Sequence, residues 1–257
     1  MRRTSCRLAP AAAARPLLSP FGIGMSKRIA LAGSDLSITA LVATENVPAG
    51  TPLLLAPDAA LLTCQGALDA DVDGLVPPPM EMLDMLKRDT VQLDHVYLAH
   101  YLSLRCFTDR TDWFAGQINR FKNRGSVCDG DAASTRIWER FAQKYVTAPA
   151  PVFLAAVQYV LESCFRKPTT EASSSPALPP AAIAVAPVVD VAVQSRSAVN
   201  SALTATTAKV VKEAYLRGDI TGARQALLAK NDACTYWVLT TTTDIPVGSE
   251  VAVSSES

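Results

Sequence analysis

The sequence has few of the residues that build metal and redox sites. It contains two histidines, His95 and His100, whose five-residue separation misses the four-residue spacing of a helical metal-binding pair. Its six cysteines are scattered singly, so no C-x-x-C motif is present. We therefore expect no metal site, and we expect the cysteines to be small buried side chains in a reducing compartment.

Long hydrophobic runs are also missing. A membrane helix needs ~20 apolar residues, whereas the most apolar stretch, residues 179–193, is short and is interrupted by Pro187 and Asp190. The sequence also lacks a phosphate-binding G-x-x-x-x-G-K-[ST] loop, a G-x-S-x-G nucleophile elbow and an H-E-x-x-H helix. These absences argue against a membrane span, a P-loop nucleotide site and the common hydrolase classes.

Acidic residues are absent from the first 34 positions. Residues 1–28 are instead rich in arginine, alanine and serine, which is the composition of a mitochondrial transit peptide. Prolines and Arg15 interrupt the apolar core that a secretory signal would need. We therefore expect a protein of the mitochondrial matrix; the alternative is a disordered tail without a targeting role. The basic residues of the segment are Arg2, Arg3, Arg7, Arg15, Lys27 and Arg28.

The rest of the chain is mildly acidic. The whole sequence has 24 basic and 24 acidic residues, so without the six N-terminal basic residues 18 basic residues remain and the net charge is −6. Because phosphate affinity depends on clustered lysine and arginine, we expect protein partners and not nucleic acid as the main ligand. A local RNA contact through Arg120, Lys122 and Arg124 stays open beside the plainer interpretation of a solvated loop.

The apolar pattern predicts an α+β fold, in which small β-sheets from an N-terminal and a C-terminal strand group are interrupted by a mainly helical insert. The two strand groups have to fold together around the insert if either is to bury its faces. We expect N-terminal strands within residues 29–79, including 38–44 and 53–56; helices over 80–168; a linker at 169–182; and C-terminal strands within 183–257, including 183–193, 236–240 and 250–253, with a helical insertion at 208–230.

Five stretches, in order, resemble the SET-domain protein lysine methyltransferases of the Rubisco large-subunit methyltransferase type. The resemblance implies a SET fold split by a helical insert, and S-adenosylmethionine as the cofactor of the family. Each stretch is weak alone, and the five together are more specific. They are residues 41–50 with 53–57 and 61–63; residues 98–113; residues 153–160 with Phe165; residues 187–190 with Ser195; and residues 244–251.

The family positions that would hold the cofactor and the target amine carry different residue types here. Ile38 and Ala40 stand where glycines let the backbone approach the cofactor. Val193 and Gln194 replace an Asn-His pair that bonds the cofactor, and valine offers no polar side-chain atom. Ser255 stands where a tyrosine orients the amine. Glu162 and Ser163 replace a Ser-Arg pair. Asp190 and the Pro-x-Gly turns, which shape the fold, match.

From these departures we expect a SET-like protein that is not an enzyme, has no cofactor and has no catalytic or cofactor-binding residues. The expected role is a subunit or assembly factor of a large mitochondrial complex, with protein subunits as partners and the mitochondrial ribosome as the first guess. The last step is analogy. One alternative is an active S-adenosylmethionine-dependent protein-lysine methyltransferase. Another is a free-standing regulator that binds a peptide.

Overall fold

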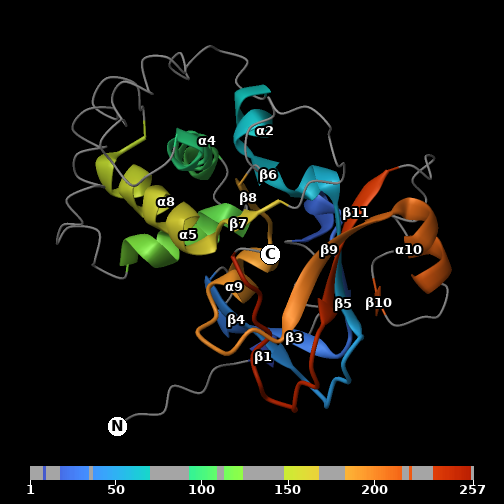
Figure 1. Cartoon of the computed structure of the whole chain (residues 1–257). Coiled ribbons are helices and arrows are strands. Elements are labelled where there is room, and N and C mark those ends of the chain that lie inside the picture. The colour runs from blue at the N-terminus through green and yellow to red at the C-terminus, as the bar shows by residue number, and fades with distance from the viewer. Residues whose placement is uncertain are drawn as a thin grey trace, which may run out of the picture.

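The computed structural model describes residues 8–9, 18–34, 37–69, 93–108, 113–123, 148–167, 183–215, 220–221 and 234–255. Within these residues the chain forms three small antiparallel sheets and a separate group of helices (Figure 1). The fold class is therefore α+β, as the sequence predicts. The linker expected at residues 169–182 lies outside the described residues.

The largest sheet contains strands from both ends of the sequence. Its order is β10-β2-β5-β11-β9, and every neighbouring pair is antiparallel. The expectation that the two strand groups fold together is thus confirmed. The strands are β2 (Gly24–Ser26), β5 (Pro52–Pro57), β9 (Ser201–Thr207), β10 (Ile220–Thr221) and β11 (Thr235–Thr241).

The two smaller sheets have three strands each. One has the order β1-β3-β4 and contains β1 (Leu8–Ala9), β3 (Ile29–Ser34) and β4 (Ser37–Ala43). The other has the order β6-β8-β7 and contains β6 (Leu62–Thr63), β7 (Phe165–Arg166) and β8 (Ile183–Val185). The short helical turn η1 (Ser19–Phe21) precedes β2, η2 (Asp58–Ala60) joins β5 to β6, and helix α2 (Cys64–Asp69) follows β6.

The described part of the insert is helical, as predicted, up to the short strand β7. Helices α4 (Leu93–Thr108), α5 (Trp113–Asn123) and α8 (Ala150–Ser163) pack against one another at one side of the sheets (Figure 1). Phe114 and Phe121 meet Tyr159 edge-on, with ring centroids 6.3 and 5.7 Å apart, an arrangement that suits aromatic quadrupoles. No helix in the described ranges is long and apolar enough to cross a membrane.

Two similar turns lie side by side between β4 and β5 and after β11. Each contains a glycine with a left-handed backbone, Gly50 at a φ of 78° and Gly248 at 82°, which glycine adopts without steric cost. The side chain of Asp244 accepts a hydrogen bond from the backbone of the first turn at 2.8 Å, and that of Asn46 accepts one from the second at 2.9 Å. Each turn therefore supplies the acceptor that the other needs.

Some C-terminal expectations were wrong. The strand expected over residues 183–193 ends at Val185; Val188 has a φ of 72°, and the short helix α9 (Val189–Val193) follows. The backbone reversal at Val188 explains why the apolar run does not continue as a strand. Of the helix expected at 208–230, the first part is α10 (Ala208–Tyr215), whereas Ile220 and Thr221 form β10; residues 216–219 and 222–230 lie outside the described residues. Residues 250–253 form only isolated bridges.

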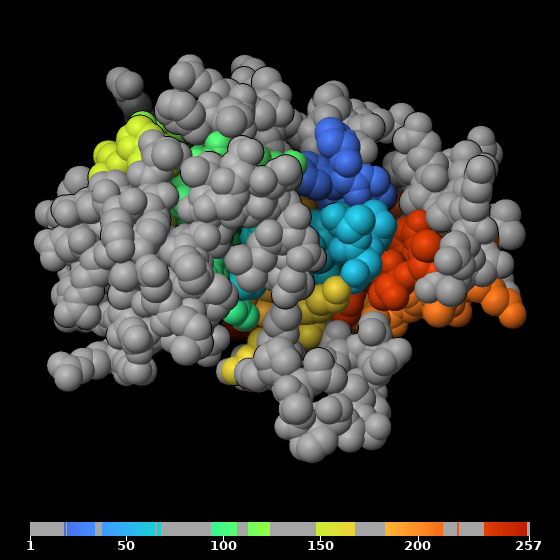
Figure 2. Space-filling view, turned by 90° about the horizontal axis from the view of Figure 1, so that it is seen from above, coloured from blue at the N-terminus to red at the C-terminus, as the bar shows by residue number. Residues whose placement is uncertain are grey.

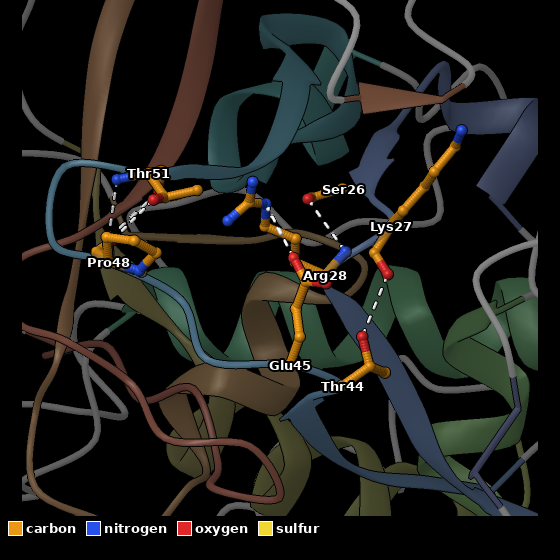
Figure 3. Close-up of polar contacts among 8 residues, drawn as sticks. Ser26, Lys27, Arg28, Thr44, Glu45, Pro48 and Thr51 are labelled. Carbon is orange, nitrogen blue, oxygen red and sulfur yellow. Dashed lines mark hydrogen bonds and ion pairs between the residues drawn. The ribbon is translucent and has the colours of Figure 1, made fainter.

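Residues 18–28 belong to the folded body, although the sequence groups them with the N-terminal leader. Leu18 and Met25 are 3% exposed, and β2 lies inside the largest sheet. Figure 3 shows the end of the segment, where the Thr44 hydroxyl donates to the carbonyl of Lys27 at 3.2 Å and Arg28 pairs with Glu45 at 3.2 Å. Figure 2 shows the segment in blue against the cyan residues around α2. The mitochondrial address itself stays a prediction.

Candidate functional site

One face of α5 carries the polar side chains of the candidate site. Trp113, Gln117 and Arg120 recur at helical spacing, so they share a face, and all three are buried. Trp113 Nε1 donates to Asp190 Oδ2 at 2.9 Å. Arg120 Nη1 donates to the carbonyl of Ile38 at 2.9 Å. This face of the helical insert therefore meets β4 and α9.

Asp190 is completely buried at the start of α9. Its carboxylate accepts hydrogen bonds from the Tyr159 hydroxyl at 2.6 Å, from Trp113 Nε1, and from the backbone N–H of Val191 at 2.8 Å. Burial raises the pKa of Asp190 from 3.8 to about 6, although the three hydrogen bonds and nearby Arg120 oppose the shift. The carboxyl group is thus a hydrogen-bonded anchor for α5 and α8.

A second network begins at Arg120 and crosses four elements. Besides its bond to Ile38, Arg120 donates through Nη2 to Gln194 Oε1. The amide nitrogen of Gln194 in turn donates to Ser163 Oγ at 2.6 Å. β4, α5, the end of α9 and the end of α8 are therefore held together by side-chain hydrogen bonds.

The structure brings some of the predicted positions together and separates others. Ile38, Gln194 and Ser163 meet through Arg120, whereas Ala40 lies apart in a small cluster with Ala32 and Val42. A register shift in the β3–β4 pairing between Ala32 and Gly33 explains the separation, because it interrupts the alternation of faces along β4. Ile38 and Ala40 therefore do not line one site.

The remaining predicted positions lie outside the network. Val193 is partly buried and packs against the main core. Glu162 is exposed at the end of α8 and accepts a hydrogen bond from Gln158 at 3.1 Å. Ser255 is exposed, and its backbone carbonyl accepts from the N–H of Arg166 at 3.0 Å. Of the Glu162-Ser163 pair, only the serine contributes to the site.

Sequence reasoning missed Arg120 as a site residue and placed it in a basic cluster that could contact RNA. The structure places Arg120 in the core at 8% exposure, so its guanidinium is engaged with Ile38 and Gln194. Lys122 is exposed, and Arg124 lies outside the described residues. The local RNA contact stays a prediction for Lys122 and Arg124. The Trp113–Gln117–Arg120 spacing was the sequence signal for a shared helix face.

Gln117 lies between the two networks on the same face of α5. Its side chain is fully buried, and within the described part of the chain neither its amide nitrogen nor its amide oxygen has a hydrogen-bond partner. A buried polar group without a partner costs about 1–3 kcal/mol. The polar face of α5 therefore has a partnered group at each end and an unsatisfied amide in the middle.

The cysteines only partly follow the expectation of burial. Cys64 is buried, and burial with nearby Asp94 raises the pKa of its thiol to about 12. Cys164 is half-buried, its Sγ lies 3.5 Å from His95 Nε2, and burial raises its pKa to about 11. Cys234 is exposed, contrary to expectation. Both shifted thiols are protonated near neutral pH and are therefore poor nucleophiles.

The described residues contain no group of three or more potential metal ligands.

These features define an α+β protein whose candidate site is a buried polar junction between a helical insert and a small sheet. No family model matches the chain, and no curated protein matches it. One matching solved structure is described as the SET domain of LSMT bound to lysine and AdoHcy, with 9% sequence identity and a TM-score of 0.45. The match covers 96% of this chain and 54% of the other, so the chain spans about half the length of that protein.

This comparison corrects one expectation. The sequence suggested a protein that is not an enzyme, but the similar solved structure is a SET domain that holds lysine and AdoHcy. The expectation is therefore withdrawn.

We predict that Asp190 makes stability depend on pH. Because its pKa of about 6 in the folded protein lies above its usual 3.8, the folded state holds the proton more tightly than the unfolded chain. The stabilisation is complete below about pH 4 and is lost as pH rises through about 6, a loss on the order of 2–3 kcal/mol. Unfolding by urea from pH 4 to 7.5 should show this loss in the wild type but not in Asp190→Asn. Exposed Asp244→Asn is the control, and identical pH profiles for Asp190→Asn and the wild type would contradict the prediction.

We predict that Arg120→Met lowers the free energy of unfolding by at least about 2 kcal/mol, because buried acceptors that lose their donor cost about 1–3 kcal/mol each. The acceptors are the carbonyl of Ile38 and the amide oxygen of Gln194. The matched control is Lys122→Met, an exposed position on the same helix, which should change stability by less than about 0.5 kcal/mol. Equal effects of the two substitutions in urea unfolding would show that the Arg120 contacts contribute little.

We predict that Gln117→Leu raises the free energy of unfolding by about 1 kcal/mol, because it replaces an unsatisfied buried amide with an apolar group of similar size. The control is Gln158→Leu, at a half-buried amide that bonds Glu162, which should not stabilise the protein. Thermal and urea unfolding measure both variants. A loss of stability in Gln117→Leu would mean that the amide has a partner in solution.

Proposed function

We propose that this chain is a SET-like subunit or assembly factor of a large mitochondrial complex, and that the mitochondrial ribosome is the first complex to test. The five ordered stretches that resemble the Rubisco large-subunit type support the SET-like assignment. The arrangement of the described elements agrees with it, since strands from both ends of the chain form one sheet around a helical insert.

The observation that carries this proposal is the hydrogen-bond network around Arg120. At Ile38 and Gln194, where the resemblance implies cofactor contacts, the polar groups are bonded to Arg120 within the protein. Ser163 continues the network through Gln194. These bonds connect the walls of the junction and stabilise one arrangement of β4, α5, α8 and α9. A fixed arrangement of this kind suits a protein that is recognised through its outer surface by partner proteins.

Charge and composition support the mitochondrial setting and the kind of partner. The segment before Leu18 contains four arginines and no acidic residue, as a transit peptide does. The chain without its N-terminal basic residues has a net charge of −6, which favours protein surfaces over the phosphate backbone of nucleic acid. A ribosomal partner would still allow a local RNA contact at exposed Lys122.

Sedimentation of a mitochondrial lysate through a density gradient tests the proposal. We expect the chain to migrate with a megadalton particle and to follow one ribosomal subunit when magnesium is removed, whereas a soluble matrix enzyme stays near the top as the control. Migration as a free protein would overturn the proposal.

The same purified protein then separates the two alternatives. Transfer of a labelled methyl group from S-adenosylmethionine to a lysine would favour the methyltransferase. Co-purification of one substoichiometric partner without transfer would favour the peptide-binding regulator.

A further inference from the structure

The folded body begins inside the segment whose composition predicts a leader. Leu18, Ile23 and Met25 are between 3% and 7% exposed, and Phe21 stacks edge-on against Phe114 with ring centroids 5.6 Å apart. Removal of residues up to 28 would delete β2 from between β10 and β5. Each buried apolar side chain lost would lower the stability of the fold. A cut compatible with this fold therefore lies before Leu18.

The residues before that point include a strand. β1 pairs antiparallel with β3, with Leu8 opposite Ala32 and Ala9 opposite Leu31. The other edge of β3 is paired with β4, so within the described residues β1 is the strand that covers the outer edge of β3. A cut between residues 10 and 17 would remove β1 and expose the backbone N–H and C=O groups of this edge.

We propose that β1 occupies the outer edge of β3 as a temporary strand, and that its removal with the N-terminal segment opens this edge to an extended segment of a protein partner. The pairing of β1 shows the geometry, an antiparallel strand opposite Leu31 and Ala32. This inference rests on the mitochondrial address and the protein partners of the proposed function. It names the surface through which such a partner docks.

The chemistry of the edge explains both the temporary strand and the kind of partner. An open sheet edge pairs readily with other chains, so a strand that covers it until processing protects the protein from aggregation. Backbone hydrogen bonds would supply the affinity for a partner strand, and side chains on alternate positions the specificity. Ala32, which lies opposite Leu8 in this pairing, is a small residue, so no bulky side chain of β3 stands at that position of the edge. Proline is excluded at the positions that donate to β3.

A peptide-binding experiment on the full chain tests the open edge. The double variant Leu8→Pro, Ala9→Pro cannot maintain the β1 pairing, because proline lacks a backbone N–H. The probe is a fluorescent peptide of residues 4–13 with Cys6→Ser. In fluorescence anisotropy we expect the double variant to bind it at least tenfold more tightly than the wild type. The control variant Ala12→Pro, Ala14→Pro changes two residues outside β1 and should behave like the wild type.

A modified form of the probe peptide provides a second control, which does not depend on how well the variant folds. A peptide that is N-methylated at the positions of Leu8 and Ala9 cannot donate to the edge, and its binding should be lost. Equal binding of both peptides, or equal binding by all three chains, would overturn the proposal. Dimerisation of the double variant without peptide binding would also overturn it, because a second copy would then be the occupant.

The mature N-terminus of the native protein is the second test. Mass spectrometry of the protein from mitochondria should find a first residue between positions 10 and 18. An intact Met1, or a first residue beyond Leu18, would overturn this inference. The two proposals fail separately: a processed chain that binds the peptide but sediments alone would contradict the complex and keep the docking edge.

Discussion

Pairing between β5 and β11 brings the two ends of the sequence together, and the other contacts of the protein depend on it. Leu54 lies opposite Leu239 and Ala56 opposite Trp237, and all four side chains are fully buried. The closure of so long a loop is a small extra cost, since each doubling of loop length adds only about 0.6 kcal/mol. Burial at this pair of strands offsets that cost, and β2 and β10 extend the sheet beyond β5 while β9 extends it beyond β11.

With the sheet closed, the helical insert still needs a defined position. Asp190 and Arg120 provide it, because each joins α5 to an element outside the helical group. A carboxylate and a guanidinium buried in the same region also lower the electrostatic cost of each other. Buried charged groups of this kind are weak sources of net stability, but any other position of α5 would leave them unpaired. The two networks thus favour the observed position of α5 against β4 and α9.

Strands that are buried on both faces were predicted from the sequence more accurately than strands with exposed residues. The apolar run of β5 and the Pro-x-Gly turns were readable, and the β4 strand was found within a residue of its ends. β9 was missed because it is rich in alanine and threonine and exposes Thr204 and Ala205, so its strand character comes from pairing with β11. α9 was missed because its valines favour a strand, whereas the backbone at Val188 turns the chain away.

The residues of the candidate site were likewise predicted only in part from the sequence. The resemblance located Ile38, Gln194 and Ser163, which the structure connects, but it gave no reason to include Arg120. A basic residue near the end of a helix usually faces solvent, so only its spacing from Trp113 shows that it shares a buried face. Ala40 was misplaced because a sequence pattern of alternating faces does not reveal a register shift.

The basic residues of the N-terminal segment belong to two different parts of the chain, which composition alone does not separate. The four arginines before residue 18 precede Leu18, the first buried core residue that the structure describes, and have the composition expected of a targeting segment. Lys27 and Arg28 instead form the tight connection between β2 and β3, where the Lys27 carbonyl accepts from Thr44 and the Arg28 side chain pairs with Glu45. Charge at those two positions therefore follows from an exposed turn. A boundary drawn by composition falls at residue 28, whereas a boundary drawn by burial falls ten residues earlier, and only the second leaves the largest sheet intact.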